Sequence, residues 1–294
     1  MRSFMNVLRV GRYRVLQHLG GGGSSEVYLA EDTVMNRKVA LKVLRRLNAD
    51  ERDLRHFERE IRCASMINHP NIVTVLDVGV EDEIQYIASE YVEGETLRQR
   101  MSRGPMDVTD ALDVAIGVAG ALTAAHEAWT VHRDIKPENI MLRRDRGVKI
   151  LDFGVATMAG GGDGTDPLRR PRLGTLYYLS PEQVRGETVI DTRSDIYSLG
   201  VVLYEMLAGY PPFDGASAMD ILAMIVEGAV PPLPANVPPE LCGIVEQAMR
   251  KSIYERTQTA NALVEELTGL RLDLAIRARE ATMRPAYAPR SLPD

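Results

Sequence analysis

The sequence predicts an α+β protein of two lobes: a small antiparallel β-sheet with one main helix, then a larger and mainly helical part. Up to about residue 91, short segments alternate between apolar and polar residues, which is the period of a half-buried strand. Beyond residue 94, longer segments have the apolar spacing of helices. We assign residues 1–12 to an N-terminal extension, 13–91 to the first lobe, 92–268 to the second lobe and 269–294 to a C-terminal tail.

The first lobe is predicted to contain strands and one helix. The clearest strand covers residues 37–44, where Val39, Leu41 and Val43 share one face and Lys42 lies on the other. A charged segment at residues 54–66 repeats its apolar residues at helical spacing. The other strands are expected at residues 13–16, 26–30, 71–78 and 84–91, with a glycine run at residues 20–23.

The second lobe is predicted to consist mainly of helices. Its longest candidate is the alanine-rich segment Val108–Glu127. Residues 131–154 mix polar and apolar residues in a compact segment, and the glycines at 160–164 indicate a loop. Further helices are expected at residues 194–208, 218–227, 241–250 and 260–267, and the tail begins with helical spacing and ends in a loose, proline-containing segment.

Composition narrows the classes of function. The chain has 294 residues, 45% of them hydrophobic, which is enough to bury a large core. A net charge of −6 argues against a nucleic-acid partner. The most apolar run, residues 114–126, is shorter than the ~20 residues of a membrane-spanning helix, so we expect no span. The two cysteines, Cys63 and Cys242, match no metal spacing and fit reduced thiols of a cytoplasmic protein.

Two features of the first lobe indicate phosphate binding. The glycines at 20–23 lie between two strands, where backbone N–H groups can approach phosphate oxygens closely, although a flexible hairpin turn has the same pattern. A β-rich segment follows them, which argues against a dinucleotide-binding fold, and the absence of Gly-Lys-Ser/Thr excludes a Walker loop. Lys42 is one of only five lysines among 35 basic residues. It is either a solvated strand residue or a point charge for phosphate oxygens, which Glu60 could hold in place.

The chemically richest segment lies in the second lobe. It has the sequence HRDIKPEN at residues 132–139 and LDFG at residues 151–154. Asp134, Asn139 and Asp152 supply oxygen atoms without a zinc-type set of Cys and His, which suits a magnesium ion that shares its shell with substrate phosphates. A carboxylate beside a hydroxyl group can accept its proton, and Lys136 would lie beside a transferring anion.

In this order, these residues resemble the signature set of the protein kinases. That set is a Gly-rich loop, a V-A-I-K lysine, H-R-D with a following Asn, D-F-G and A-P-E. From about residue 13 to 267 the chain is similar to the bacterial eukaryotic-like (Hanks-type) serine/threonine kinases, with two departures. Ser25 replaces the third loop glycine, and Ser180-Pro181-Glu182 replaces A-P-E.

The resemblance implies a two-lobe kinase fold and an activity. The chain would transfer the γ-phosphoryl group of Mg-ATP, with Mn²⁺ as an alternative metal, to Ser/Thr hydroxyls of proteins in bacterial signalling. Asp134 would accept the hydroxyl proton and Lys136 would steady the γ-phosphoryl group. Lys42 would contact the α/β-phosphates and pair with Glu60.

The resemblance also implies the nucleotide and metal sites. Asn139 and Asp152 would hold the metal. Backbone groups at Glu90 and Val92 would meet adenine at the hinge, and Ser89 is the small residue at the gatekeeper position before them. The residues expected around ATP are Leu19, Gly20, Gly21, Gly22, Gly23, Val27, Ala40, Lys42, Ser89, Glu90, Val92 and Met141.

Further contacts follow from the same resemblance. Glu182 would pair with Arg256, and Asp195 would brace the catalytic loop. An arginine before the catalytic aspartate often binds a phosphate on the activation segment, here residues 155–173. The residues expected to be regulatory are Arg133, Thr165 as the phosphorylation site, and Thr175.

Two other functions remain open on the sequence alone. A pseudokinase scaffold usually lacks one of Lys42, Asp134 or Asp152, and all three are present. A small-molecule phosphotransferase is disfavoured by residues 174–182, which match the segment that builds a peptide-binding shelf in protein kinases. We therefore expect protein substrates and a homodimer for autophosphorylation, with neither nucleic acid nor a membrane span.

Overall fold

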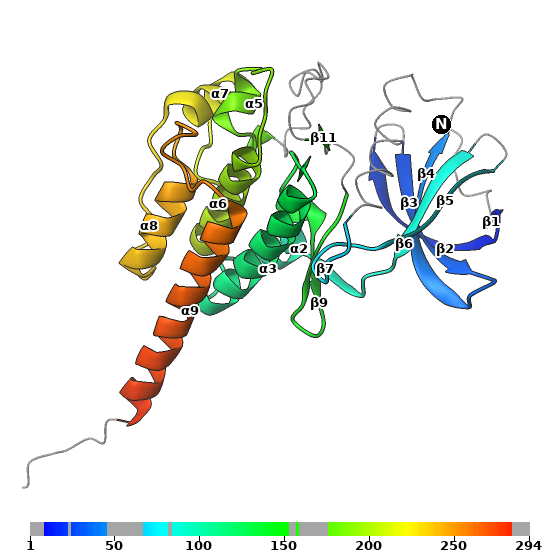
Figure 1. The fold of residues 1–294 in the computed structure, drawn as a ribbon, viewed down its shortest axis with the longest axis horizontal. Helices are drawn as coiled ribbons and strands as arrows, with labels where there is room; N and C mark the ends of the chain where they lie inside the picture. The colour runs from blue at the N-terminus through cyan, green and yellow to red at the C-terminus, as the bar shows by residue number, and fades with distance from the viewer. Residues whose placement is uncertain are drawn as a thin grey trace, which may run out of the picture.

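The fold is that of a computed structural model, which describes residues 9–22, 25–45, 67–81, 84–152, 157–158 and 176–283. A β-sheet lobe from the N-terminal part of the chain lies beside a helical lobe from the C-terminal part (Figure 1). A small three-stranded sheet, β10-β9-β7, lies where the two lobes meet (Figure 1). The predicted two-lobe α+β architecture is confirmed.

The N-terminal lobe is an antiparallel sheet of six strands in the order β1-β2-β3-β4-β6-β5. Val39, Leu41 and Val43 of β4 pack in its core with Tyr13 and Ala88. Because neighbouring side chains of a strand point to opposite faces, Lys42 is directed away from this core. The strands are β1 (Arg9–Val10), β2 (Tyr13–Gly22), β3 (Ser25–Asp32), β4 (Arg37–Arg45), β5 (Val75–Glu81) and β6 (Ile84–Glu90).

The sequence located most of these strands, but β2 continues past residue 16 into the glycine run as far as Gly22, where it pairs with β3, and one strand start was placed wrongly. Strands β4 and β6 confirm the predictions at residues 37–44 and 84–91, whereas β5 begins at Val75 and not at residue 71. Residues before it bond to the other lobe: Val73 N donates to Ile150 O at 3.0 Å, and Ile150 N donates to Asn71 O at 2.8 Å. The predicted helix at 54–66 lies outside the described residues.

The C-terminal lobe is arranged around helix α6 (Arg193–Ala208), whose residues from Ser194 to Leu207 are all buried. A helix that is covered on every side belongs at the centre of its domain, and α6 contacts α3, α8 and α9. The other elements are α2 (Leu97–Met101), α3 (Val108–Glu127), η3 (Pro137–Asn139), α5 (Pro181–Val184), α7 (Ala218–Glu227), α8 (Pro239–Ala248) and α9 (Ala260–Met283), with short strands β7 (Gly94–Thr96), β8 (Thr130–Val131), β9 (Ile140–Arg143), β10 (Val148–Ile150) and β11 (Thr157–Met158).

The helix bounds that differ most from the predictions are those of α8 and α9. Helix α8 begins at Pro239, two residues before the expected start, because proline is favoured in the first turn of a helix. Helix α9 continues to Met283, through the position at which the tail was expected to begin. Its extension is held by ion pairs from Arg271 to Asp113 and from Arg277 to Glu240.

Helix α3 has the predicted bounds and is longer than the apolar run considered for a membrane span. By length and composition it is the only helix of the described residues that could cross a membrane, with 20 residues and a mean hydropathy of 1.5. Half of its most apolar window is buried inside this fold, and it packs on α6 and α9. In this structure α3 is therefore a core helix of the C-terminal lobe.

Candidate active site

An ion pair across the two lobes marks the centre of the site. Lys42 Nζ of β4 donates to Asp152 Oδ1 at 2.8 Å, and 110 positions of sequence separate the two residues. Asp152 follows β10 and has a positive φ of 60°, which an aspartate adopts at a local cost. Lys42 therefore lies on the face of β4 that points away from the sheet core, and it contacts Asp152, which the sequence predicted to be a metal ligand.

A second carboxylate lies beside the first, in the loop before η3. Lys136 Nζ donates to both carboxylate oxygens of Asp134, at 2.8 and 2.6 Å. Burial raises the pKa of Asp134, the positive charge of Lys136 lowers it, and the net shift is upward. The negative charge of Asp152 also raises this pKa, so the two carboxylates lie close enough to interact.

Asn139 completes this group from the end of η3. Its Nδ2 donates to the backbone oxygen of Asp134 at 2.9 Å and to Asp134 Oδ2 at 3.0 Å. These bonds fix the amide group, so that its oxygen is directed away from Asp134. The structure therefore brings together five predicted residues: Lys42, Asp134, Lys136, Asn139 and Asp152.

Asp195 at the start of α6 holds the loop that carries Asp134. Its carboxylate accepts the backbone N–H of His132 at 2.8 Å and that of Arg133 at 2.7 Å, and it contacts His126 Nε2 at 2.9 Å. Burial would raise the pKa of Asp195, but the hydrogen bond and charge of His126 hold it below its usual value. Arg133 has a positive φ of 66°, a backbone conformation that residues with a large side chain rarely adopt. The two backbone hydrogen bonds to Asp195 stabilise this conformation. The expected brace is present.

The residues expected around the nucleotide come from strands β2, β3, β4, β6 and β9 and from the hinge after β6. Val27 lies opposite Lys42 in the β3–β4 pair, and Ala40 lies opposite Ser89 in the β4–β6 pair. The strands approach closely at Gly21, where a Cβ atom would lie 2.8 Å from the backbone oxygen of Ser25. The structure describes Leu19 as exposed, Val92 as buried and Met141 in β9, and places Gly20 and Gly22 in β2.

The hinge contains a contact that the sequence did not predict. Lys149 donates to the Glu90 carboxylate and, at 3.0 Å, to the backbone oxygen of Ile72. Burial would raise the pKa of Glu90, but its bond with Lys149 lowers it. Glu90 N donates to Thr74 O at 2.9 Å, so its backbone contribution to a nucleotide would come from its carbonyl oxygen. The scarcity of lysine in the chain was the one signal that could have directed attention to Lys149.

A cavity of about 330 Å³ borders the same hinge. Glu90, Tyr91 and Val92 line one side of it. The other side is formed by the β9–β10 turn and by Lys149. Both acidic and basic side chains line this cavity. None of Lys42, Asp134, Lys136, Asn139 and Asp152 is among its lining residues.

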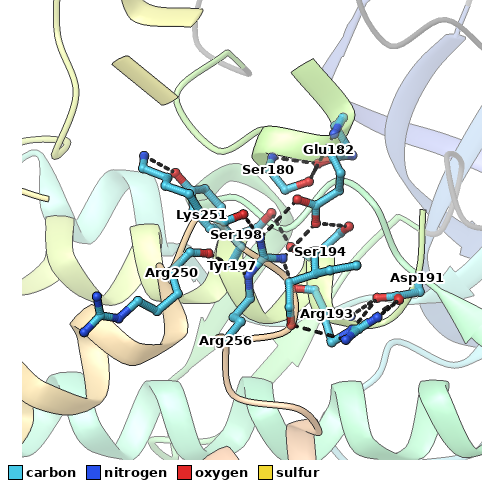
Figure 2. A network of polar contacts seen from close by, with 12 residues as sticks. Ser180, Glu182, Asp191, Arg193, Ser194, Tyr197, Ser198, Arg250, Lys251 and Arg256 are labelled. Atoms are coloured by element: carbon cyan, nitrogen blue, oxygen red, sulfur yellow. Dashed lines mark hydrogen bonds and ion pairs between the residues drawn. The ribbon is translucent and has the colours of Figure 1, made fainter. Parts of the chain in front are cut away.

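A buried ion pair supports the segment that follows the activation region. Arg256 donates to both oxygens of Glu182 in α5, at 2.7 and 3.1 Å, and Ser194 donates to the same carboxylate (Figure 2). Burial would raise the pKa of Glu182, but Arg256 holds it below its usual value. From the same helix, Gln183 Nε2 donates to the backbone oxygen of Arg133 at 3.0 Å. The expected Glu182–Arg256 pair therefore anchors α5 beside the loop of Asp134.

Some predicted residues cannot be placed. Gly23, Glu60, Thr165 and Thr175 lie outside the described residues, as does Cys63. Arg133 is described, and its guanidinium group donates to the backbone oxygen of Ile190 at 3.3 Å.

Comparison with known proteins agrees with this geometry. A family model described as "Protein kinase domain" matches residues 13–267. The chain is 40% identical to serine/threonine-protein kinase PrkC of Bacillus subtilis over 262 residues, which cover 87% of this chain and 40% of that protein. It is 42% identical to serine/threonine-protein kinase PknB of Mycolicibacterium smegmatis over 265 residues, covering 87% of this chain and 42% of that protein.

A further relative is serine/threonine-protein kinase PknB of Mycobacterium tuberculosis, 39% identical over 292 residues, which cover 96% of this chain and 45% of that protein. The chain thus spans about two fifths of the length of these relatives. The family match extends over most of the chain and includes both lobes and the residues that join them. The chain belongs to the protein kinase family, as a kinase domain of the bacterial Hanks type.

Proposed function

We propose that this chain is the catalytic domain of an ATP-dependent protein serine/threonine kinase that acts in bacterial signalling. The observation that best supports this is the group formed by Lys42, Asp134 and Asp152, where one lobe contributes the lysine and the other both carboxylates. Such a group can bind a polyphosphate and activate a hydroxyl at the same place. The names of the relatives support serine and threonine as acceptors.

In the proposed reaction, the substrate hydroxyl oxygen forms a bond to the γ-phosphorus while the bond to the β,γ-bridging oxygen breaks and ADP leaves. Asp134 orients the hydroxyl and takes its proton. Its Oδ2 accepts from both Lys136 and Asn139, whereas Oδ1 accepts the longer of the two bonds from Lys136, which favours Oδ1 as the proton acceptor. Lys136, whose ammonium group is bonded to Asp134, would offset the negative charge of the transferring group.

The donor set of the site fits a divalent cation that binds together with a phosphate. No group of three or more His, Cys, Asp or Glu side chains in the described part of the chain could hold a metal by itself. Asn139 and Asp152 offer oxygen donors, and Mg²⁺ typically takes its other ligands from phosphates and water. When bound, Mg²⁺, or Mn²⁺ in its place, would neutralise phosphate charge. We propose Asn139 and Asp152 as its protein ligands.

The other sites and regulatory residues are proposed on the family resemblance. Leu19, Val27, Ala40, Val92 and Met141 would enclose adenine and ribose beneath the glycine-containing β2–β3 hairpin. Autophosphorylation at Thr165, within a homodimer and read by Arg133, would regulate the domain, and Thr175 is a further proposed regulatory residue. We place the domain in the cytoplasm, where ATP is available.

Transfer of radiolabelled phosphate from ATP tests this function. We expect wild-type protein with Mg²⁺ to label a generic protein substrate and itself, and Asp134→Asn to lose about 10³-fold or more of that rate, since the general base is lost. Arg103→Gln serves as a matched control, because its ion pair with Glu95 is exposed and includes none of the proposed site residues. Labelling of small hydroxyl compounds in preference to protein would support the small-molecule phosphotransferase instead. Equal labelling by wild type and Asp134→Asn would exclude the proposed role of Asp134.

A further inference from the structure

A charged contact on the β2–β3 hairpin has no part in the proposed reaction. His18 Nε2 of β2 contacts Glu26 Oε2 of β3 at 2.5 Å, and the His18 ring packs edge-on against the Tyr28 ring with 5.2 Å between the ring centroids. We call His18 and Glu26 the hairpin clip. The clip joins the strand that leads into the glycine run at residues 20–23 to the strand that follows this run.

The hairpin clip lies on the face of the sheet that is turned away from Lys42. Residues directly opposite each other in a strand pair project to the same face, and Val27 lies opposite Lys42. Its neighbours Glu26 and Tyr28 project to the other face, where Tyr28 packs in the core of the N-terminal lobe. A nucleotide bound beside Lys42 therefore does not touch the clip, so the clip acts through the backbone of the hairpin.

The clip passes over the backbone of the glycine run. Gly21 lies opposite Glu26 in the β2–β3 pair, and a Cβ atom on Gly21 would lie 2.5 Å from Glu26 Oε2. The space that this glycine leaves is therefore taken by the carboxylate that reaches His18. The register of the pair shifts between His18 and Gly20, so the regular ladder is interrupted there. The clip thus bonds the strands through side chains where their backbone pairing is irregular.

Holding the glycine run affects how it binds phosphates. Backbone N–H groups of such a run can approach phosphate oxygens closely, as the sequence predicts for residues 20–23. Glycine loses more conformational freedom on ordering than any other residue. A run that is already held on one side loses less of that freedom when phosphates bind, so its affinity for them is higher. This gain applies to the phosphate groups of a nucleotide and not to its adenine.

The strength of the clip depends on pH. Glu26 faces Gly21 of β2 and Val43 of β4, neither of which carries a charge. His18 is therefore the cation that the described strands bring to this carboxylate, and the titratable side chain that packs on its ring, Tyr28, is buried. A histidine ring gains its positive charge as pH falls from 8 to 5, and a hydrogen bond between charged groups is stronger than a neutral one. The clip should therefore be stronger at pH 6 than at pH 8.

We propose that His18 and Glu26 are positioning residues, which hold the glycine run in the shape that binds the phosphates of ATP and do so more strongly when the imidazole ring is protonated. This inference rests on the proposed function, because it concerns the nucleotide of the same site.

Calorimetric titration with ATP, and separately with adenosine, tests this inference. The proteins are wild type, His18→Gln and Glu26→Gln, with Mg²⁺ at pH 6 and pH 8. At pH 6 we expect each variant to raise the Kd of ATP about threefold, which is the scale of a partly exposed ion pair. The Kd of adenosine, which has no phosphate, should not change measurably. At pH 8 the Kd of His18→Gln divided by that of wild type should fall below about 1.5, and this ratio removes the titration of ATP itself.

Glu26→Gln is the decisive variant, because it keeps the shape of the side chain and removes a negative charge. If His18 acted only by attracting phosphate through its charge, loss of the Glu26 carboxylate would tighten ATP binding, whereas the clip predicts weaker binding. The matched control is Arg14→Gln, which removes an ion pair with Glu31 between the same two strands, two register shifts away from Gly21. It should bind ATP as wild type does at both pH values.

The results separate the two claims. ATP binding by Glu26→Gln that equals or exceeds that of wild type at pH 6, or an equal loss of affinity for ATP and for adenosine, would overturn the hairpin clip. An effect of His18→Gln that has the same size at pH 6 and pH 8 would overturn the role of the imidazole charge. Wild-type protein that binds no ATP and transfers no phosphate would overturn the proposed function itself.

Discussion

Asp134 receives opposing influences from its neighbours. Burial and the nearby charge of Asp152 raise its pKa, and the two hydrogen bonds from Lys136 lower it. A proton acceptor works best when its pKa lies nearer to the working pH than that of an ordinary aspartate, provided that it remains ionised. The position of Lys136 therefore affects both the orientation of Asp134 and its protonation.

We propose that Ser89 sets the size of the space behind the expected adenine position. Its hydroxyl donates to the backbone oxygen of Ala40 at 3.3 Å, across the β4–β6 pair. We predict that the wild-type enzyme accepts ATP analogues with a bulky N6 substituent and that Ser89→Met rejects them at least tenfold more strongly, because added side-chain volume in a packed site is destabilising. The measurement is kcat/KM for the analogue relative to ATP.

Ser89→Ala is the matched control for that prediction. It removes the hydroxyl but not the space, so it should use the bulky analogue as wild type does. Equal use of the analogue by wild type and Ser89→Met would contradict the placement of Ser89 beside the nucleotide.

At the residue scale, the sequence predicted the group around Asp134 because its members belong to short motifs. Asp134, Lys136 and Asn139 lie within six positions, and Asp152 follows shortly after them. The Lys149–Glu90 and Arg98–Glu205 contacts join residues 59 and 107 positions apart, and no motif connects them. Such contacts depend on how the elements pack and could not be read from local patterns.

At the scale of elements, the short helix α5 depends on one buried ion pair. The side chains of Arg256 and Glu182 are 0% and 4% exposed, so each charge has lost its water and relies on the other. Ser180 caps the helix and bonds with Gln183, and Gln183 connects it to the backbone of Arg133. Loss of the pair would therefore affect the support of the catalytic loop as well as stability.

We predict that Arg256→Met destabilises the domain by about 3–5 kcal/mol near neutral pH, because it leaves the Glu182 carboxylate buried without its partner. In wild type the folded pKa of Glu182 lies below its unfolded value. Its contribution to stability is therefore full above the unfolded pKa of about 4.5 and is lost as pH falls through the folded pKa. In the variant the folded pKa should rise above the unfolded one, so its stability should fall as pH increases through that window. Thermal unfolding across pH measures both slopes.

The control for this prediction is Arg250→Met. Arg250 pairs with Glu246 at 3.0 Å, but both side chains are about half exposed, so the change should cost less than about 1 kcal/mol and have little pH dependence. A difference between wild type and Arg256→Met that stays constant from pH 4 to pH 7 would contradict the assigned charge state of Glu182.

Element bounds were predictable where one periodicity dominated. Helix α3 and strand β4 follow simple apolar patterns, and their predicted and observed bounds agree closely. Residues 71–74 have the apolar pattern of a strand, but they lie before β5 in the chain. Asn71 and Val73 form backbone bonds with Ile150 of the other lobe, and a local pattern does not show which partner a segment pairs with. The end of α9 is held by exposed ion pairs, which leave no apolar signal.

At the scale of the whole molecule, two kinds of contact join the lobes in the described residues. Backbone bonds of Asn71 and Val73 with Ile150 make a fixed connection near the hinge, and Asn71 Nδ2 also donates to Val148 O at 2.8 Å. The Lys42–Asp152 ion pair joins the lobes through side chains at the site of the proposed chemistry. The two-lobe fold was predictable from the change in periodicity, whereas the relative position of the lobes required these contacts.

The central claim is that residues of both lobes act on one substrate group as a single unit. A double-mutant cycle in phosphoryl transfer, with Lys42→Met, Asp152→Asn and both changes together, tests it most directly. We predict that each single change lowers kcat/KM by several factors of ten and that the double variant loses little more than the worse single variant, because residues that act as a unit are non-additive. Losses that multiply in the double variant would contradict the account, since they would mean that Lys42 and Asp152 act independently.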